Sequence, residues 1–366
     1  MKKLLIGVLV ALTGVAPMTA SAQTPACDGT FHAWHAIEGD TVLFDLDMLG
    51  PNDGYAVGQN IPASGRRAEP LVVHFDDADY QTTIPPYELS TDLSAVEAIT
   101  PNDIYAVGGT VSRHQKLVIY NYDGTQWSLM DVPQPGPNSH LDAVAATSPN
   151  DVWAGGYYET ASGEYDILLM HYDGAWTQSY VPSPGKYAGL YGLTAVSPND
   201  VWAVGFKKGI SRPYALHWDG TSWTPIRFPR SIRSHDGTFY AMVEISPTEQ
   251  WFVGNAYSKH PLAVHRVDGH SVLTDVPNVR GEEAFFDATA VGSEVWAVGW
   301  RIDQVTHPRA AHWDGSAWTN AVVEGAAPNG TMEGVDTDGT GAVWALSKIF
   351  ASVSDEDDVI EKECMP

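Results

Sequence analysis

The stretch "SPNDVWAVG", residues 197–205, recurs in near copies along the chain, and these copies decide the fold. The other clear copies are "GPNDGYAVG" from residue 50, "TPNDIYAVGG" from residue 100 and "SPNDVWAGG" from residue 148. The aromatic residue of the phrase recurs every 45 to 50 residues, at Tyr55, Tyr105, Trp153, Trp202, Trp251, Trp296 and Trp344. A repeat of this length is typical of the blades of a β-propeller.

Each repeat can be divided into four short strands. In the fourth repeat, "YGLTAV" (191–196) alternates in polarity, and Ser-Pro-Asn-Asp then forms a turn before "VWAVG". "YALHW" (214–218) ends in an Asp-Gly hairpin turn, which "SWTPI" (222–226) follows. The sequence therefore predicts an all-β fold, a seven-bladed β-propeller of four-stranded blades.

The seventh repeat ends before its fourth strand, so another part of the chain must supply it. "CDGTFHAW" (27–34) resembles the Asp-Gly-Thr segment that opens the fourth strand elsewhere, as in "HWDGTSW" from residue 217. We expect this N-terminal strand to close the ring in the last blade, beside "VIEKEC" (359–364). Cys27 and Cys364 would then be neighbours, and in an oxidising compartment they are predicted to form a disulfide.

The N-terminal residues are typical of a secretory signal peptide. Two lysines precede an apolar run over residues 4–15, and Ala-Ser-Ala at 20–22 supplies a cleavage site. We therefore divide the chain into a signal peptide (1–22) and a single propeller domain (23–366), monomeric and secreted or periplasmic. The apolar run is too short for a membrane span. The net charge of −25 argues against nucleic-acid binding.

The segment "IYAVGG…VIYNYDGTQW" (104–127) resembles a kelch repeat, with a double glycine, then a tyrosine and a tryptophan. The Asp-Gly-x-x-Trp phrase is similar to a shortened Asp box of secreted bacterial propellers. Both resemblances imply a propeller and are shared by binding proteins and enzymes alike, so they do not imply a function. Kelch-like copper radical oxidases need a cysteine within the ring, and this chain has none between residues 27 and 364.

Repetition separates structural residues from functional candidates. Residues that recur in every blade are interpreted as architectural, and residues that occur once as candidates for function. A histidine recurs at one place in the third strand of five repeats, which predicts packing or hydrogen bonding and no metal site. These residues are His74, His171, His217, His265 and His312. No cofactor is predicted, because no phosphate-binding or zinc motif occurs.

Basic residues gather in the loops that follow the second and the fourth strand of each repeat. Fifteen of the eighteen Lys and Arg residues after the signal peptide fall there, Arg309 and Lys348 among them, with non-repeating histidines such as His140. Charge excluded from strands and short turns would also collect in these loops. The densest group, in repeats 4 to 6, is the predicted ligand-binding set: Lys207, Lys208, Arg212, Arg230, Arg233, Lys259, His260 and Arg280.

Two functions are consistent with this pattern. The first is a binding module for an anionic polysaccharide, a surface glycan or a partner protein, because arginine binds carboxylates and sulfates in a bidentate fork. Tyr187, Tyr191 and Trp300 lie in or beside the same loops and could stack on sugar rings. The alternative is a polysaccharide lyase, in which His235 and Tyr257 would exchange protons with the substrate.

Overall fold

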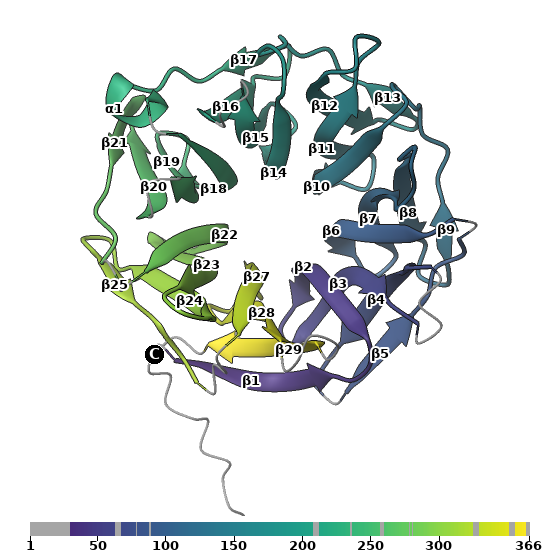
Figure 1. The fold of residues 1–366 in the computed structure, drawn as a ribbon, viewed down its shortest axis with the longest axis horizontal. Coiled ribbons are helices and arrows are strands. Elements are labelled where there is room, and N and C mark those ends of the chain that lie inside the picture. The colour runs from purple at the N-terminus through teal and green to yellow at the C-terminus, as the bar shows by residue number, and fades with distance from the viewer. Residues whose placement is uncertain are drawn as a thin grey trace, which may run out of the picture.

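The chain forms a seven-bladed β-propeller, as predicted (Figure 1). The computed structural model describes residues 30–62, 67–77, 79–87, 89–207, 212–234, 236–256, 260–277, 279, 281–324, 329–350 and 356–363. Its seven antiparallel sheets stand around a central axis, and the first strand of each blade faces that axis. Strands alternate with tight turns on one face of the ring and with longer loops on the other, which we call the loop face.

Six blades consist of strands that follow one another in the sequence. Blade 1 contains β2 (Thr41–Gly50), β3 (Asp53–Asn60), β4 (Glu69–Phe75) and β5 (Tyr80–Thr83). Blade 2 contains β6 (Thr91–Thr100), β7 (Asp103–Thr110), β8 (Leu117–Tyr122) and β9 (Trp127–Leu129). Blade 3 contains β10 (Ser139–Ser148), β11 (Asp151–Glu159), β12 (Tyr165–Tyr172) and β13 (Trp176–Gln178).

The next three blades follow the same order. Blade 4 contains β14 (Gly189–Ser197), β15 (Asp200–Lys207), β16 (Arg212–Trp218) and β17 (Trp223–Pro225). Blade 5 contains β18 (Gly237–Ser246), β19 (Glu249–Ala256), β20 (His260–Val267) and β21 (His270–Leu273). Blade 6 contains β22 (Glu282–Val291), β23 (Glu294–Ile302), β24 (Thr306–Trp313) and β25 (Trp318–Asn320).

A short helix, α1 (Arg230–Arg233), lies in the connection between blades 4 and 5, where the sequence analysis expected only a loop. Its Ile232 is buried against blades 4 and 5.

Blade 7 closes the ring with strands from both ends of the chain. It contains β27 (Gly330–Thr337), β28 (Val343–Phe350), β29 (Glu356–Glu363) and β1 (Thr30–Ile37), with β26 (Val322–Val323) beside β1. β1 pairs antiparallel with β29, as predicted, and parallel with β26, which the sequence analysis did not foresee. His32 Nδ1 lies 2.5 Å from Glu324 Oε2, so the N-terminal strand is also tied to the connection from blade 6.

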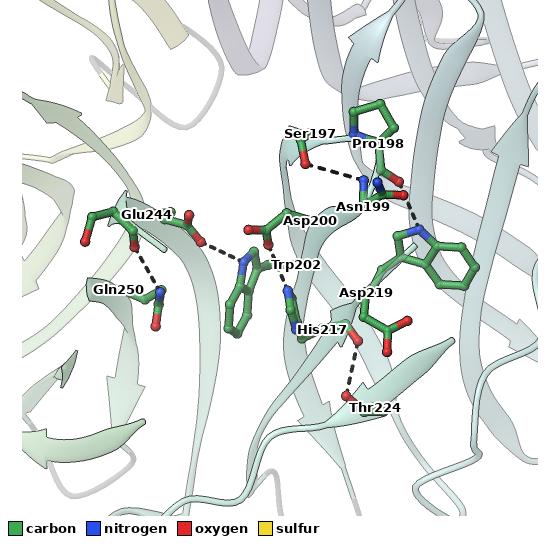
Figure 2. Close-up of polar contacts among 12 residues, drawn as sticks. Ser197, Pro198, Asn199, Asp200, Trp202, His217, Asp219, Thr224, Glu244 and Gln250 are labelled. Carbon is green, nitrogen blue, oxygen red and sulfur yellow. Dashed lines mark hydrogen bonds and ion pairs between the residues drawn. The ribbon is translucent and has the colours of Figure 1, made fainter. Parts of the chain in front are cut away.

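The repeated phrase builds the same hydrogen-bonded unit in five blades, as Figure 2 shows for blade 4. His217 Nε2 lies 2.8 Å from the carboxylate of Asp200, which ends the Ser-Pro-Asn-Asp turn. The histidine ring stacks on Trp202, with 4.2 Å between the ring centroids. The other four recurring histidines pair in the same way with Asp53, Asp151, Glu249 and Glu294. The prediction that these histidines pack and form hydrogen bonds is confirmed.

The predicted disulfide can be tested although Cys27 and Cys364 lie outside the described residues. Phe31 of β1 is opposite Glu363 of β29, so the described strands end side by side at this point. We expect the intact mass of the protein to rise only after reduction and alkylation. In the chain-entropy model a cross-link over so long a loop stabilises by about 5 kcal/mol, so Cys364→Ser should lower the melting temperature. Alkylation of both thiols without reduction would contradict the prediction.

Candidate functional site

Every innermost strand carries a β-bulge near the loop face of the ring. The register shifts at the third to fifth residue of each strand, and the bulged residue lines the central channel. We call the seven bulged residues the bulge ring: Phe44, Ser94, Asp142, Tyr191, Tyr240, Phe286 and Glu333. The backbone is the same at all seven positions, whereas the side chains are aromatic, acidic or small. By the criterion of repetition, this ring is a candidate site.

The glycine that ends the opening phrase makes this bulge possible. Gly205 of β15 lies opposite Leu190, the fully buried residue that precedes the bulged Tyr191. A β-carbon on Gly205 would lie 2.1 Å from the carbonyl oxygen of Gly189, so only glycine fits. The equivalent glycines of blades 1, 2, 3, 5 and 6, each opposed by a strand carbonyl at 1.9–2.1 Å, are Gly58, Gly108, Gly156, Gly254 and Gly299. Blade 7 has Ser347 at this position, so the repeated phrase holds six of the seven bulged residues in place.

Three neighbouring blades contribute aromatic side chains to the ring. We call Tyr191, Tyr240 and Phe286, from blades 4, 5 and 6, the aromatic arc. The ring centroids of Tyr191 and Tyr240 are 5.1 Å apart, and those of Tyr240 and Phe286 are 5.5 Å apart. Phe206 stacks behind Tyr191, and Trp300 packs beside Phe286. The arc is therefore a continuous apolar wall, supported from behind, along one side of the channel mouth.

The bulge ring is polar on either side of the aromatic arc, at Asp142 of blade 3 and at Glu333 of blade 7. Asp142 accepts a hydrogen bond from His140 Nδ1 at 3.2 Å, and Asp92 lies 3.5 Å from the other ring nitrogen of this histidine. Glu333 lies 3.9 Å from Lys348 Nζ, which in turn lies 4.8 Å from the ring centroid of Phe44. Each carboxylate of the bulge ring thus has a cation beside it. The channel mouth combines an apolar wall with two carboxylates that can accept hydrogen bonds.

Five further carboxylates lie deeper in the channel and join neighbouring blades: Asp45, Asp47, Glu97, Asp287 and Asp336. Asp45 accepts a hydrogen bond from Val96 N of the next blade at 3.0 Å, and Asp287 accepts one from Val335 N at 2.8 Å. We call this set the carboxylate girdle. Its members come from blades 6, 7, 1 and 2, on the side of the ring where the chain ends meet, and it has a structural role.

Burial raises the pKa of the girdle carboxylates. It raises the pKa of Glu97 to about 8 and that of Asp287 to about 7, against a small opposing effect of backbone hydrogen bonds. The pKa of Asp45 is raised well above its usual value by burial and by the nearby Asp287. Burial opposes the charge on His140, but hydrogen bonds to Asp142 and Asp92 and the charges of both outweigh it and raise its pKa to about 10.

These shifts predict that the protein loses stability as the pH rises above about 5. Carboxyl groups in the unfolded chain titrate near pH 4, so between pH 4 and 8 the folded state binds more protons than the unfolded state. His140 acts in the same direction between about pH 6.5 and 10. We expect the free energy of unfolding to fall by a few kcal/mol between pH 5 and pH 8.5, with each pKa unit equivalent to about 1.4 kcal/mol.

Chemical denaturation at a series of pH values measures this dependence. Glu97→Gln keeps a side-chain acceptor for the backbone but cannot ionise, so it should flatten the curve. Stability that increases from pH 5 to pH 8.5 would contradict the shifts assigned to the girdle.

The structure places the described members of the predicted ligand-binding set on the loop face but does not bring them to the channel mouth. Arg230 and Arg233 lie on α1 at the periphery of the ring (Figure 1). Lys207 is paired with Arg212 at the base of the blade 4 hairpin, and its Nζ lies 4.4 Å from the ring centroid of Tyr214. His260 begins β20. Five of the predicted residues lie outside the described residues: Lys208, His235, Tyr257, Lys259 and Arg280.

Three basic residues assigned to the loop face are buried. Arg309 forms an ion pair with Glu283, with Nε 2.9 Å from Oε2, and its side chain is 4% exposed. Lys348 lies against Phe44 and Glu333, and His140 lies between two aspartates. All three lie within strands, close to their loop-face ends, so the prediction placed them beside the correct loops but did not foresee that their side chains are buried. The basic character of the loop face is correspondingly weaker than the sequence analysis expected.

The described part of the chain contains no group of three or more His, Cys, Asp or Glu side chains placed to hold a metal ion. Within the same residues, no helix is long and apolar enough to cross a membrane.

Comparisons with known proteins show the fold of this chain and no family. No protein family and no curated protein matches the sequence. YCF48 bound to the D1 peptide is similar over 93% of this chain and 98% of its own, with a TM-score of 0.61 and 14% identity. The likeness is one of fold alone. The resemblance to kelch and Asp-box proteins stays a prediction.

Two further structures belong to binding and sensing proteins. An Aleuria aurantia lectin in complex with Fucalpha1-6GlcNAc matches 79% of this chain and 96% of its own, with a TM-score of 0.54 and 15% identity. The extracellular domain of a one component system from B. thetaiotaomicron matches 94% of this chain and 40% of its own, with a TM-score of 0.56 and 11% identity.

The sequence analysis found Tyr191 but missed the bulge ring as a set. Each ring residue follows an apolar residue that is 0% exposed: Leu43, Leu93, Leu141, Leu190, Phe239, Phe285 and Met332. Aligning the seven first strands on this residue would have revealed one variable position directly after it. The signal was therefore present in the sequence, but its significance depends on the register shift, which turns that residue into the channel.

Proposed function

We propose that the protein is a carbohydrate-binding module whose site is the mouth of the central channel on the loop face. The aromatic arc carries this proposal. Its three rings come from three neighbouring blades and form a wall that the fold does not require, because blades 2, 3 and 7 have Ser94, Asp142 and Glu333 at the same position. Ligand sites typically combine apolar and aromatic walls with a few convergent polar groups.

The chemistry of the mouth suits a sugar ring. The apolar C–H face of a pyranose packs on aromatic side chains, and its equatorial hydroxyls reach acceptors at the side. Tyr and Trp offer large rigid surfaces for such contacts and lose little conformational entropy. The aromatic arc supplies the wall, while Asp142 and Glu333 supply acceptors at its two ends. A lectin with the same fold that binds a fucosylated glycan supports this class of ligand.

A protein or peptide is the second candidate partner. The propeller YCF48 is described with a bound D1 peptide, so this architecture holds peptides as well as glycans. No observation on the described residues favours the polysaccharide lyase. His235 and Tyr257, its proposed acid and base, lie outside them.

The exposed cations of the loop face add a second part to the proposal, that the ligand also carries anionic groups. Arg212, Arg230 and Arg233 are exposed and lie around the outside of the mouth, beyond blades 4 and 5. They would hold anionic groups of a longer glycan whose sugar ring lies on the arc. Secretion is part of the same proposal, with residues 1–22 removed as a signal peptide and residues 23–366 forming one domain.

A glycan array probed with three proteins tests the site. We expect the wild type to bind a defined group of glycans and Tyr191→Ala/Tyr240→Ala to lose this binding at least tenfold, equivalent to about 1.4 kcal/mol. Tyr180→Ala is the matched control, because Tyr180 is 87% exposed in the blade 3–4 connection and does not line the channel. An array without signal, or a signal that survives in the double variant, would refute the proposal.

Salt dependence separately tests whether the exposed arginines bind anionic groups of the ligand. If Arg230 and Arg233 hold anionic groups, Arg230→Glu/Arg233→Glu should weaken binding, and the wild-type affinity should fall with salt, since charges are screened over about 8 Å at physiological ionic strength. Ala175→Glu places a charge on the opposite face, at an exposed position in the blade 3 hairpin turn, and should have no effect. Binding that ignores both salt and the arginine changes would restrict the site to the channel mouth.

A further inference from the structure

We infer that the bulge ring takes the end of a glycan chain, and that the sugar at this end carries no negative charge. The inference rests on the proposed function and names the class of ligand for the same site.

The size of the cavity limits what can enter. The channel mouth and the girdle below it enclose about 260 Å³. Small-molecule sites usually measure roughly 300–1,000 Å³, so this cavity holds one sugar-sized unit and not a folded segment of polymer. The aromatic arc also fits a single sugar unit. Its neighbouring ring centroids are 5.1 and 5.5 Å apart, so the three rings form one curved surface and not separate subsites.

The wall of the cavity is continuous around the ring. Each of the seven innermost strands contributes residues to it. Hydrogen bonds join neighbouring blades below the mouth: Val96 N donates to Asp45, Val335 N donates to Asp287, and Thr194 Oγ1 donates to the Met242 carbonyl at 2.6 Å. An internal segment would have to bend sharply to place one of its sugars in this narrow space. A chain end or a branch tip can enter it directly.

The charges around the cavity select against an anionic end. Asp142 and Glu333 stand at the mouth, and the girdle carboxylates lie below. Asp142 Oδ2 is buried and accepts no hydrogen bond from a described residue, so this oxygen gains a donor if the side chain turns toward a sugar hydroxyl in the channel. A uronate or sialate carboxylate at the same place would face these oxygens, and the neighbouring cations His140 and Lys348 are already paired with carboxylates of the protein. It would therefore lose its hydration with little compensation. Neutral hydroxyls are therefore preferred inside the ring, whereas anionic groups are restricted to the loops outside.

An array of matched glycan families tests the inference on the full-length secreted protein. Each family presents one neutral sugar, galactose, glucose, mannose, fucose or N-acetylglucosamine, as the chain end, as an internal unit, and as a chain end extended by sialic acid or carrying sulfate. We expect the bound glycans to share their terminal sugar whatever the inner chain is. Internal placement or an anionic cap should reduce binding at least tenfold. Ser94→Lys, which adds a cation to the bulge ring, should recover part of the binding to anionic ends.

The possible outcomes separate the two proposals. Binding that depends on Tyr191 and Tyr240 but follows an internal motif, or that prefers anionic ends, would overturn this inference and leave the proposed function standing. Binding that is insensitive to both tyrosines, or no binding to any glycan, would overturn the proposed function itself.

Discussion

Gly205→Ala is expected to destabilise the protein by about 3 kcal/mol, the upper range for forcing extra volume into a packed interior. The new β-carbon would lie 2.1 Å from the carbonyl oxygen of Gly189 and 2.8 Å from the Cα of Leu190, and both contacts are to backbone. No side-chain rotation can relieve them, so the innermost strand of blade 4 must move. Chemical denaturation monitored by tryptophan fluorescence measures the loss.

Gly50→Ala is the matched control for this prediction. Gly50 is the first residue of its turn phrase, the position that Thr100 and Ser197 occupy in blades 2 and 4. A β-carbon at Gly50 would meet nothing within 4 Å. Its substitution should change the free energy of unfolding by less than about 0.5 kcal/mol, as is usual for surface positions. Equal losses in the two variants would show that the bulge does not explain why the phrase ends in glycine.

Arg309→Met is expected to cost about 3–5 kcal/mol, because it leaves a buried carboxylate without its cation. The Glu283 side chain is 0% exposed and holds Arg309 Nε at 2.9 Å, while its other oxygen accepts a hydrogen bond from Val279 N. Arg309 also donates to the side chain of Asn320 at 2.8 Å, so the substitution breaks a connected network. Thermal and chemical denaturation both measure this loss.

Two comparisons isolate the buried charge as the cause. Arg309→Met/Glu283→Gln removes both charges and should recover part of the loss. Arg301→Met breaks the partly exposed pair with Asp303, which lies at 3.1 Å, and should cost no more than about 1 kcal/mol. A loss in Arg309→Met no larger than in Arg301→Met would show that the ion pair contributes little in the folded protein.

The sequence predicts the fold well because the propeller is specified by its turns. Ser-Pro-Asn-Asp and Asp-Gly fix each strand boundary, and the recurring His217-type pair of blade 4 has counterparts in four other blades. The closing strand followed from one short resemblance at residues 27–34. β26 and α1 were not predicted, since a two-residue strand and a four-residue helix have no periodicity to detect.

The site was harder to predict because residues that determine it are separated by whole blades. Tyr191, Tyr240 and Phe286 are about 46 to 49 residues apart, and each reads as an ordinary strand residue in its own repeat. The β-bulge turns all three side chains toward the axis, and the amino-acid composition of the strands does not reveal this bulge. Basic residues were more conspicuous, yet Arg309 and Lys348 are buried, since sequence position alone does not distinguish the end of a strand from the loop beside it.

Calorimetric titration of Tyr240→Ala with a glycan that the wild type binds tests the central claim most directly, together with a melting curve of the same sample. The claim is that the repeat carries the fold and the bulge ring carries the site. It predicts at least a tenfold rise in Kd with a melting temperature within a few degrees of the wild type, and an unchanged Kd for Tyr180→Ala. An unchanged Kd in Tyr240→Ala, or a Kd that rises only because the variant unfolds, would contradict it.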